Sequence, residues 1–309
     1  MSESFDHCRS SEIKIPSSVL EIENNAFTNC SNLEKITVDS NNSTYANNNQ
    51  DGIIYDKNVK KLICYPMGKK DTSFTTPYGV ETLCSNAFKG NYNLKEVILS
   101  KSVKEVTGAT FEGTRLIDIK VDEANENYSN YNNDGALYNK DISKIIVYPR
   151  GKDETTFTIP NSVTTIGYEA FVNCNKMIEI IIPKGVTTIE DCAFGISYKL
   201  NKIFIPNSVT SIGANIGINE LITGNTVKSA GIVTRTNSTA HQYAINNNLT
   251  VELDDTSPII QSISYSTKET AKSVKVTITA NEPIKTNVSD NRNWEYVPNT
   301  DKKSIVAEL

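Results

Sequence analysis

Apolar residues recur along most of this chain at one fixed spacing. Residues 159–180 show the pattern most clearly, with Val163 and Ile166 followed by the pair Ala170-Phe171. Each of these positions carries the same type of residue again 23 residues further on, and the same template fits upstream copies. A period matched at so many positions predicts a repeat solenoid, in which one supersecondary unit stacks on the next. Six valines head the copies: Val19, Val80, Val103, Val163, Val186 and Val209.

Each copy contains one short strand. In residues 200–206 the first, fourth and sixth positions are apolar and the seventh is proline, so Leu200, Ile203 and Ile205 are expected to face inward. One coil cannot bury this stripe alone, whereas stacked coils form a continuous core. The strands that begin at five positions should lie parallel in one sheet, and five phenylalanines should form a buried column. The strand starts are Leu33, Leu94, Leu116, Met177 and Leu200, and the column is Phe27, Phe88, Phe111, Phe171 and Phe194.

Two of the spacings between copies are longer and carry matching inserts. Residues 51–69 and 134–152 are related by an offset of 83 residues. Each insert holds an Asp-Gly pair, two short apolar runs around a polar turn, and a Tyr-Pro-x-Gly-Lys sequence. Two short apolar runs around a polar turn predict a β-hairpin. The solenoid is therefore expected to alternate short coils with long ones.

The two ends of the array differ from its middle. Residues 5–8 align with the turn at residues 27–30, so the chain begins inside a repeat, and we expect the natural protein to extend upstream, where any secretion signal would lie. After Val209 the template is lost, and we expect the array to end there. Residues 239–248 predict a short helix that caps the last coil. The solenoid with its cap is expected to span residues 1–253.

Residues 254–309 have a different character. A polar linker at residues 254–258 precedes two alternating segments, 262–266 and 273–280. The segment resembles the start of a bacterial immunoglobulin-like domain. A full sandwich of that kind takes about 100 residues, so we expect a truncated β-sandwich-like segment, with a small hairpin cap or a swapped half-domain as alternatives.

The repeat itself resembles the BspA-type leucine-rich repeats. The shared run is Ile-Pro-Asn-Ser-Val-Thr-Thr-Ile-Gly, then Ala-Phe and Cys, as in residues 159–174, and it extends over about residues 5–253. The resemblance implies an α/β-type repeat solenoid, mostly β: a leucine-rich-repeat right-handed superhelix with β-hairpin inserts. It also implies a secreted or surface-anchored protein of a host-associated bacterium or parasitic protist, and adhesion to host or matrix proteins.

Charge and composition limit the classes of partner that are expected. The net charge of −5 is spread over mixed acidic and basic residues, which argues against a nucleic-acid partner. No stretch approaches the roughly 20 apolar residues of a membrane span, so direct membrane insertion of this chain is not expected. The N-terminus lacks the basic and apolar regions of a signal peptide. The remaining expectation is a protein partner.

Catalytic chemistry is not expected. The chain has two histidines, His7 in a repeat turn and His241 in the cap, and each is expected to be a surface or capping residue. No phosphate-binding loop, zinc-spaced cluster or nucleophile elbow occurs. The Asp-Gly pairs lack the further acids of a calcium loop and predict turns. We therefore expect no enzyme activity, no cofactor and no metal site.

The six cysteines are expected to be isolated thiols. Cys8, Cys30 and Cys174 share one repeat position, which Asn91, Thr114 and Ser197 occupy in other copies. Small residues of this kind suit a ladder of hydrogen bonds to buried turn backbone. Cys8 and Cys30 are the exception, because neighbouring coils would bring them within about 5 Å, where a disulfide can form.

The outer face of the short strands is the candidate binding surface. The third and fifth residues of each strand must point away from the core. An apolar residue at such a position can belong to a contact surface, as an anchor for a protein partner. Alternatively, an insert or a side loop covers it, or it was selected for β-propensity alone. The candidate residues are Ile98, Lys120, Ile181 and Phe204 at fifth positions and Glu96, Glu179 and Lys202 at third positions.

Three classes of function are compatible with these observations. The first is an adhesin-like binding protein at the cell surface or outside the cell. The second is a passive spacer that displays another domain from the cell wall. The third is the non-catalytic part of a larger surface enzyme.

Overall fold

The structure is a computed structural model that describes residues 7–23, 26–27, 29–216 and 231–254, and the backbone of four later strands. The chain divides into two compact units, Met1–Asp254 and Asp255–Leu309. Each unit is described by itself.

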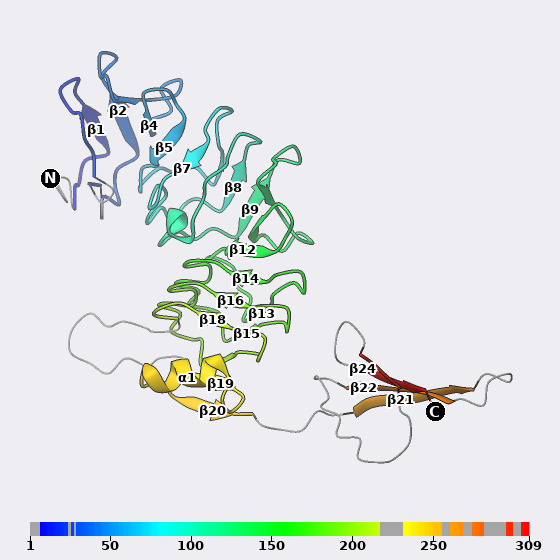
Figure 1. Ribbon diagram of the computed structural model, residues 1–309. Helices are drawn as coiled ribbons and strands as arrows, with labels where there is room; N and C mark the ends of the chain where they lie inside the picture. Colours follow the sequence, from blue (N-terminus) through cyan, green and yellow to red (C-terminus); the bar gives the residue numbers. More distant parts are fainter. Residues whose placement is uncertain are drawn as a thin grey trace. The chain divides into compact units, whose positions relative to one another are not determined.

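The first unit is a mostly β solenoid of about ten turns whose coils follow one another in chain order (Figure 1). One short strand per coil forms what we call the first column. Neighbouring coils pair in parallel, as where Ile181 of one strand lies opposite Phe204 of the next. The strands are β1 (Glu12–Ile15), β2 (Lys35–Val38), β6 (Ser73–Thr75), β8 (Glu96–Leu99), β9 (Asp118–Val121), β13 (Thr156–Thr158), β15 (Glu179–Ile181), β17 (Lys202–Phe204), β19 (Gly231–Thr234) and β20 (Val251–Leu253).

The expectation of one continuous sheet was wrong. The first column is divided into three sheets, β1-β2, β6-β8-β9 and β13-β15-β17-β19-β20. The Asp-Gly turn of each insert lies where the next strand would pair. The N–H of Ile36 donates to the carbonyl of Gly52 at 2.9 Å, and the N–H of Ile119 donates to Gly135 at 3.0 Å. Because these donors bond to the inserts, the ladders end at β2 and β9.

A second column of strands runs along another side of the coils. Its antiparallel hairpins confirm the prediction for both inserts, and the last strand of each hairpin pairs in parallel with the next coil, as Ile145 does with Ile166. The first sheet holds β3 (Tyr45–Ala46), β4 (Ile54–Asp56), β5 (Lys61–Cys64) and β7 (Thr82–Leu83). The second holds β10 (Tyr128–Ser129), β11 (Leu137–Asn139), β12 (Lys144–Val147), β14 (Thr165–Ile166), β16 (Thr188–Ile189) and β18 (Ser211–Ile212).

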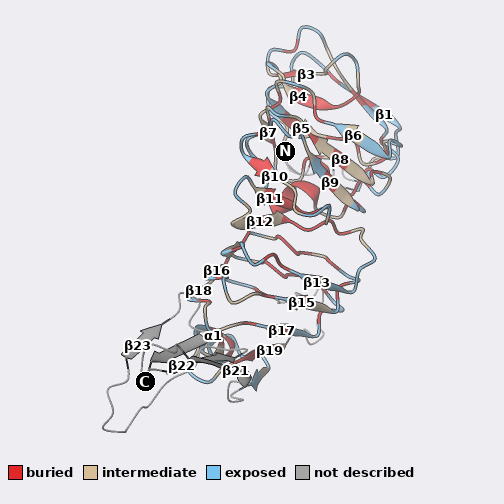
Figure 2. Ribbon diagram, turned by 90° about the vertical axis from the view of Figure 1, so that its right-hand side faces the viewer, coloured by how far each residue is buried: buried red, intermediate tan, exposed pale blue. Residues whose placement is uncertain are grey.

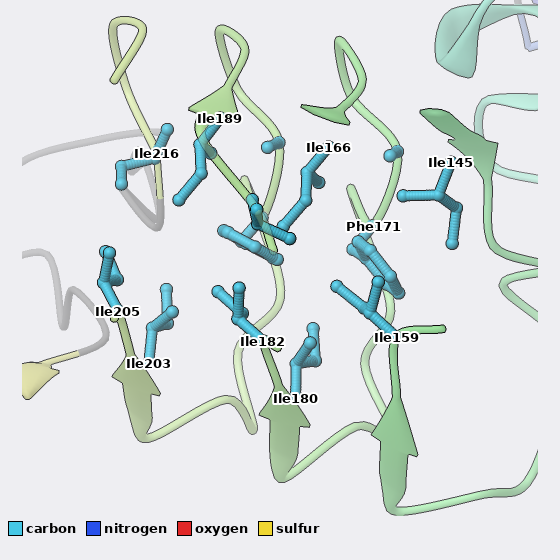
Figure 3. Packing of buried hydrophobic residues seen from close by; sticks show 14 of the residues in the cluster. Ile145, Ile159, Ile166, Phe171, Ile180, Ile182, Ile189, Ile203, Ile205 and Ile216 are labelled. Atoms are coloured by element: carbon cyan, nitrogen blue, oxygen red, sulfur yellow. The ribbon is translucent and has the colours of Figure 1, made fainter. Parts of the chain in front are cut away.

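The core lies between the two columns. Figure 3 shows Ile180 and Ile203 of the first column pointing toward Ile166 and Ile189 of the second, with Phe171 among them. All five are fully buried, and burying each side chain stabilises the fold by about 1.5–3 kcal/mol. In Figure 2 the strands carry buried residues beside exposed ones, as expected when one face of a strand lies in the core.

The aromatic column exists, but in two stacks. Phe88 packs on Phe111 with ring centroids 5.1 Å apart, and Phe171 packs on Phe194 at 5.6 Å. Each stack is extended by a tyrosine of an insert, which the sequence analysis did not include. These tyrosines are Tyr65 and Tyr148, whose ring centroids lie 5.1 and 5.4 Å from those of Phe88 and Phe171, respectively. Phe27 is only half-buried, contrary to expectation.

The third side of the solenoid is made of turns, which we call the turn side. The second residue after each phenylalanine has a positive φ, a conformation that favours glycine and asparagine. These residues are Asn29, Gly90, Gly113, Asn173 and Ile196. One copy of the turn forms a short 3₁₀ helix, η1 (Gly108–Phe111).

The repeat position shared by cysteines is a hydrogen-bonding position, as expected. Ser197 Oγ donates to the carbonyl of Phe171 at 2.8 Å and accepts from the N–H of Cys174 at 3.1 Å. Asn91 Nδ2 donates to the carbonyl of Pro66 at 2.9 Å. None of the six cysteines, all of which the structure describes, forms a disulfide, and this includes Cys8 and Cys30.

The array does not end after Val209, which corrects that expectation. Strands β19 and β20 continue the first column, and a helix replaces the usual turns between them. This helix, α1 (Thr239–Asn246), is the one predicted from the sequence, and it buries Ala240 and Ala244. The Ser238 side chain caps it by accepting from the N–H of His241 at 3.0 Å, and His241 Nδ1 accepts from the N–H of Asn237. His241 is thus a capping residue.

The second unit is a four-stranded antiparallel sheet in its described part. The strands β21 (Ile260–Thr267), β22 (Val274–Ala280), β23 (Glu295–Pro298) and β24 (Ser304–Glu308) follow the order β21-β22-β24-β23. These strands form one sheet rather than two packed sheets. They do not support the expected sandwich, and the immunoglobulin-like character of this segment stays a prediction.

Candidate binding surface

The outer face of the first column brings two of the predicted apolar residues together. Ile181 on β15 lies directly opposite Phe204 on β17. The two side chains are 43 % and 45 % exposed, although their strand neighbours Ile180 and Ile203 are fully buried. The alternation of a strand therefore holds these two side chains outside the core on a hydrogen-bonded scaffold.

Ile178 is a further exposed apolar side chain in the same coil and was not predicted. It immediately precedes β15 and is 51 % exposed. The sequence signal was available, because Ile178 occupies the second position of the strand template, where other copies carry Glu34, Lys95 or Asn201. Ile117 occupies the same position in another coil and is also exposed.

Three of the predicted residues form a separate group. Glu96 and Ile98 lie on β8, and Lys120 lies opposite Ile98 on β9. Ile98 is half-buried and Lys120 is exposed. Because the turn at Gly135 occupies the edge of β9, this group belongs to a different sheet from Ile181 and Phe204. The predicted row of side chains is therefore two patches rather than one.

Three of the charged residues of the two patches, Lys120, Glu96 and Lys202, are held in ion pairs. Lys120 pairs with Glu96, and Lys202 pairs with Glu252 of β20. The hydrogen bond from Lys120, followed by one from Ser73, lowers the pKa of the Glu96 carboxyl. Exposed pairs of this kind contribute little to stability. Their effect is to surround the apolar side chains with charged groups that are held in place and neutralise one another.

The borders of the Ile181–Phe204 pair are defined by its neighbours along the ladder. On one side Thr158 lies opposite Ile181 and is exposed. On the other side Val233 lies opposite Phe204 and is buried. Glu179, the remaining predicted residue, lies opposite Thr156 and is half-buried. The apolar surface is thus small and confined to two adjacent coils.

The described residues offer little else that could carry chemistry. They contain no group of three or more His, Cys, Asp or Glu side chains that could hold a metal ion. His7 lies in a turn with a φ of 58°, and His241 is used in capping. Across the parts of the chain that the structure places, no helix has both the length and the apolar character of a membrane span.

Stacked coils with one short strand each, leucine or isoleucine inside and a turn of fixed shape define a leucine-rich-repeat protein. The family model of the BspA type leucine rich repeat region matches this chain in six copies, over residues 1–62, 64–149 and 150–218. The chain belongs to this family.

The chain is similar to several solved structures. A leucine-rich repeat protein from Eubacterium ventriosum ATCC 27560 is 27 % identical, with a TM-score of 0.50, over 75 % of this chain and 68 % of that one. The pneumococcal vaccine antigen PcpA is 18 % identical, with a TM-score of 0.39, over 79 % of this chain and 68 % of PcpA. A leucine rich cell surface protein from Faecalibacterium prausnitzii A2-165 is 21 % identical, with a TM-score of 0.34, over 69 % and 82 % of the two chains. No curated protein matches the chain.

Proposed function

We propose that this chain is an adhesin-like binding protein, secreted or held at the cell surface, that recognises a host or matrix protein. Leucine-rich repeats of the BspA type are often surface-associated, which supports this location. The contact surface in this proposal is the outer face of the first column around Ile181 and Phe204. Glu179 and Lys202 border it, and Ile98, Glu96 and Lys120 form a second patch.

One observation carries the proposal: two large apolar side chains stand exposed and adjacent on a rigid sheet. Single exposed apolar residues are ordinary, whereas a contiguous group on a regular scaffold favours an interaction site. Aromatic residues contribute strongly to interfaces when a partner removes them from water. Phe204 is the expected anchor.

The role proposed is binding rather than catalysis. The described residues of this face offer apolar and ion-paired side chains, and the one carboxylate that meets a hydroxyl there, that of Glu96 with Ser73, is also held by Lys120. The partner proposed is a protein, because net charge and the mixed distribution of acids and bases do not suit a nucleic acid.

The test is a double variant, Ile181→Asp with Phe204→Asp, assayed on immobilised extracellular-matrix proteins and on host cells. Both side chains are exposed, so the variant should keep the melting temperature of the parent within a few degrees. We expect its affinity to fall at least tenfold, because two charges would have to be desolvated at the centre of the contact. Ser211→Asp, on the exposed side of the second column, is the matched control and should bind as the parent does.

Two results would contradict the proposal. If the folded double variant binds as tightly as the parent, this face is not the contact surface. If the parent binds nothing in the panel, the passive spacer becomes the better account.

A further inference from the structure

A groove of about 860 Å³ lies on the turn side, where Arg150 and Gly151 of the second insert line it together with residues of the neighbouring coils. In this coil Tyr148 follows the inward Ile145 by three residues, whereas Phe171 follows Ile166 by five in the next coil. The shorter route brings Gly151 so close to the preceding coil that a Cβ atom would lie 2.2 Å from the Arg115 carbonyl oxygen. Arg150 and Gly151 of the insert therefore line the groove together with Arg115 of the preceding coil and Lys176 of the following coil.

Arg150 has unused hydrogen-bonding capacity at this groove. Its side chain is 9 % exposed, and Nη2 donates to the carbonyl of Gly108 at 2.8 Å. Nε and Nη1 are enclosed by protein and have no hydrogen-bond partner among the residues that the structure places, so a ligand reaches them once the side chain turns toward the groove. The nearby Glu112 pairs instead with Lys89 at 3.0 Å. A buried guanidinium with two unpaired donors is unfavourable unless an acceptor can reach it.

The groove is cationic, although the whole chain is acidic. Its lining contains Lys95, Arg115, Arg150 and Lys176 against the single carboxylate of Asp153, a formal excess of three positive charges. Lys176 pairs with Asp153. The Arg115 guanidinium lies 5.0 Å above the ring of Tyr92. Since the net charge of the chain is −5, this concentration of cations is local.

The first insert shows that the fold does not require these cations. It has the same hairpin, and its residues lie 83 positions earlier. There Asn32 stands in place of Arg115, Met67 in place of Arg150, and Asn93 in place of Lys176. Lys95 likewise corresponds to Glu12. A structural role would be met by these four residues, none of which is a cation, so the cationic set points to a ligand.

We propose that this groove binds a carboxylate-bearing segment of a protein partner, with Arg150 as the buried anchor. The planar guanidinium suits a carboxylate, to which it can donate two parallel hydrogen bonds. Tyr92 and Ile117 are exposed apolar side chains within the same lining, and they suit the neighbouring residues of a peptide. A sulfated polysaccharide would call for cations along an extended row, whereas these are confined to one groove.

Neither Ile181 nor Phe204 lines the groove, so either surface can bind without the other. Failure of this site would leave the sheet-face contact untouched. The reverse holds as well, because the Ile181→Asp, Phe204→Asp variant keeps all four cations.

The test uses a fluorescein-labelled hexaglutamate peptide and fluorescence anisotropy at low and physiological salt. The key variant is Arg150→Met, which installs the residue found at the same place in the first insert. We expect peptide affinity to fall at least tenfold, while the melting temperature equals or exceeds that of the parent because an unpaired buried charge has been removed. Lys60→Asn, which removes an exposed cation on the second column, should bind as the parent does.

A second variant guards against misfolding. Arg115→Asn with Lys176→Asn changes the rim to the residues of the first insert and leaves the buried position intact, and it should also lose at least tenfold in affinity. The proposal is overturned if the parent does not bind the peptide, if Arg150→Met binds as the parent, or if Lys60→Asn loses as much. It is also overturned if a heparin fragment, and not the peptide, binds with this dependence on Arg150, since the ligand would then be a sulfated glycan.

Discussion

At the scale of single residues, the turn side is governed by one backbone requirement. The second residue after each phenylalanine adopts a positive φ, which asparagine and glycine tolerate and β-branched residues do not. Ile196 is the exception, with a φ of 56° and a partly exposed side chain. This residue is therefore a local source of strain that the other copies avoid.

We predict that Ile196→Asn raises the free energy of unfolding by about 1 kcal/mol, because asparagine relieves backbone strain at this φ. Urea denaturation of parent and variant measures the difference. The matched control is Asn173→Ile, one coil earlier, which should destabilise by a similar amount. A neutral or destabilising result for Ile196→Asn would show that Ile196 is not strained.

The Asp-Gly turns of the inserts contain a second residue-scale feature, a partly buried carboxyl. Burial raises the pKa of Asp134 above its ordinary value of 3.8, although the Tyr138 hydroxyl and the Ala136 N–H donate hydrogen bonds to it. The folded state then holds the proton more tightly than the unfolded state. Stability contributed by this group is present at low pH and is lost as the pH rises through the folded-state pKa.

We predict that the melting temperature of Asp134→Asn, relative to the parent, increases between pH 3.5 and pH 7. The control is Asp141→Asn in the same hairpin. The Ser143 side chain lowers the pKa of Asp141. The melting temperature of Asp141→Asn relative to the parent should therefore decrease over the same pH range. Thermal melts across pH measure both, and a falling difference for Asp134→Asn would contradict the assignment.

At the scale of elements, the aromatic stacks hold the turn side to the core. Phe171 lies between Tyr148 and Phe194 and is fully buried, whereas Phe27 is half-buried. The loss of a buried ring removes apolar burial and leaves a cavity.

We predict that Phe171→Ala costs about 3–5 kcal/mol of unfolding free energy and that Phe27→Ala costs less than about 2 kcal/mol. Denaturant unfolding monitored by circular dichroism compares the two. Equal losses would mean that exposure does not separate these positions, and a loss below about 1 kcal/mol for Phe171→Ala would mean that the stack is not core.

The sequence predicted most elements, because their signals are local or periodic. Both hairpins and the capping helix follow from turn residues and apolar runs. Tyr65 and Tyr148 could have been found as well, since each lies 23 residues before a stacked phenylalanine. The three-way division of the first column was not predictable in this way. It depends on single hydrogen bonds from Ile36 and Ile119 to insert carbonyls, and no pattern of apolar residues encodes those.

The burial of two asparagines could not be predicted from the sequence pattern either. Asn42 and Asn125 are fully buried, and each donates from Nδ2 to two carbonyls of the preceding coil. The pattern of apolar residues does not mark these two positions as buried. Burial of a polar side chain depends on coils that meet in space, and only the structure reveals it.

At the scale of the whole first unit, the coils contact chiefly their neighbours, and the apolar core falls into three clusters along the chain. The inserts that interrupt the ladders also divide the outer face. The sequence correctly placed Ile181 and Phe204 on one exposed face, because strand alternation fixes that. It could not predict that Ile98 and Lys120 belong to another sheet. Nor could it predict that Nε and Nη1 of Arg150, a residue of the groove lining, have no hydrogen-bond partner. Both features depend on the path of the second insert.

The central claim is that a protein partner contacts the outer face of the first column. The most direct measurement replaces Phe204 with a photoreactive phenylalanine and identifies cross-linked partner by mass spectrometry, after binding to a matrix protein that the parent recognises. The control places the same group at Tyr168, which is 43 % exposed on the turn side, close to the 45 % of Phe204. We predict cross-linking at position 204 and little at position 168. Cross-linking at position 168 with none at position 204 would contradict the claim.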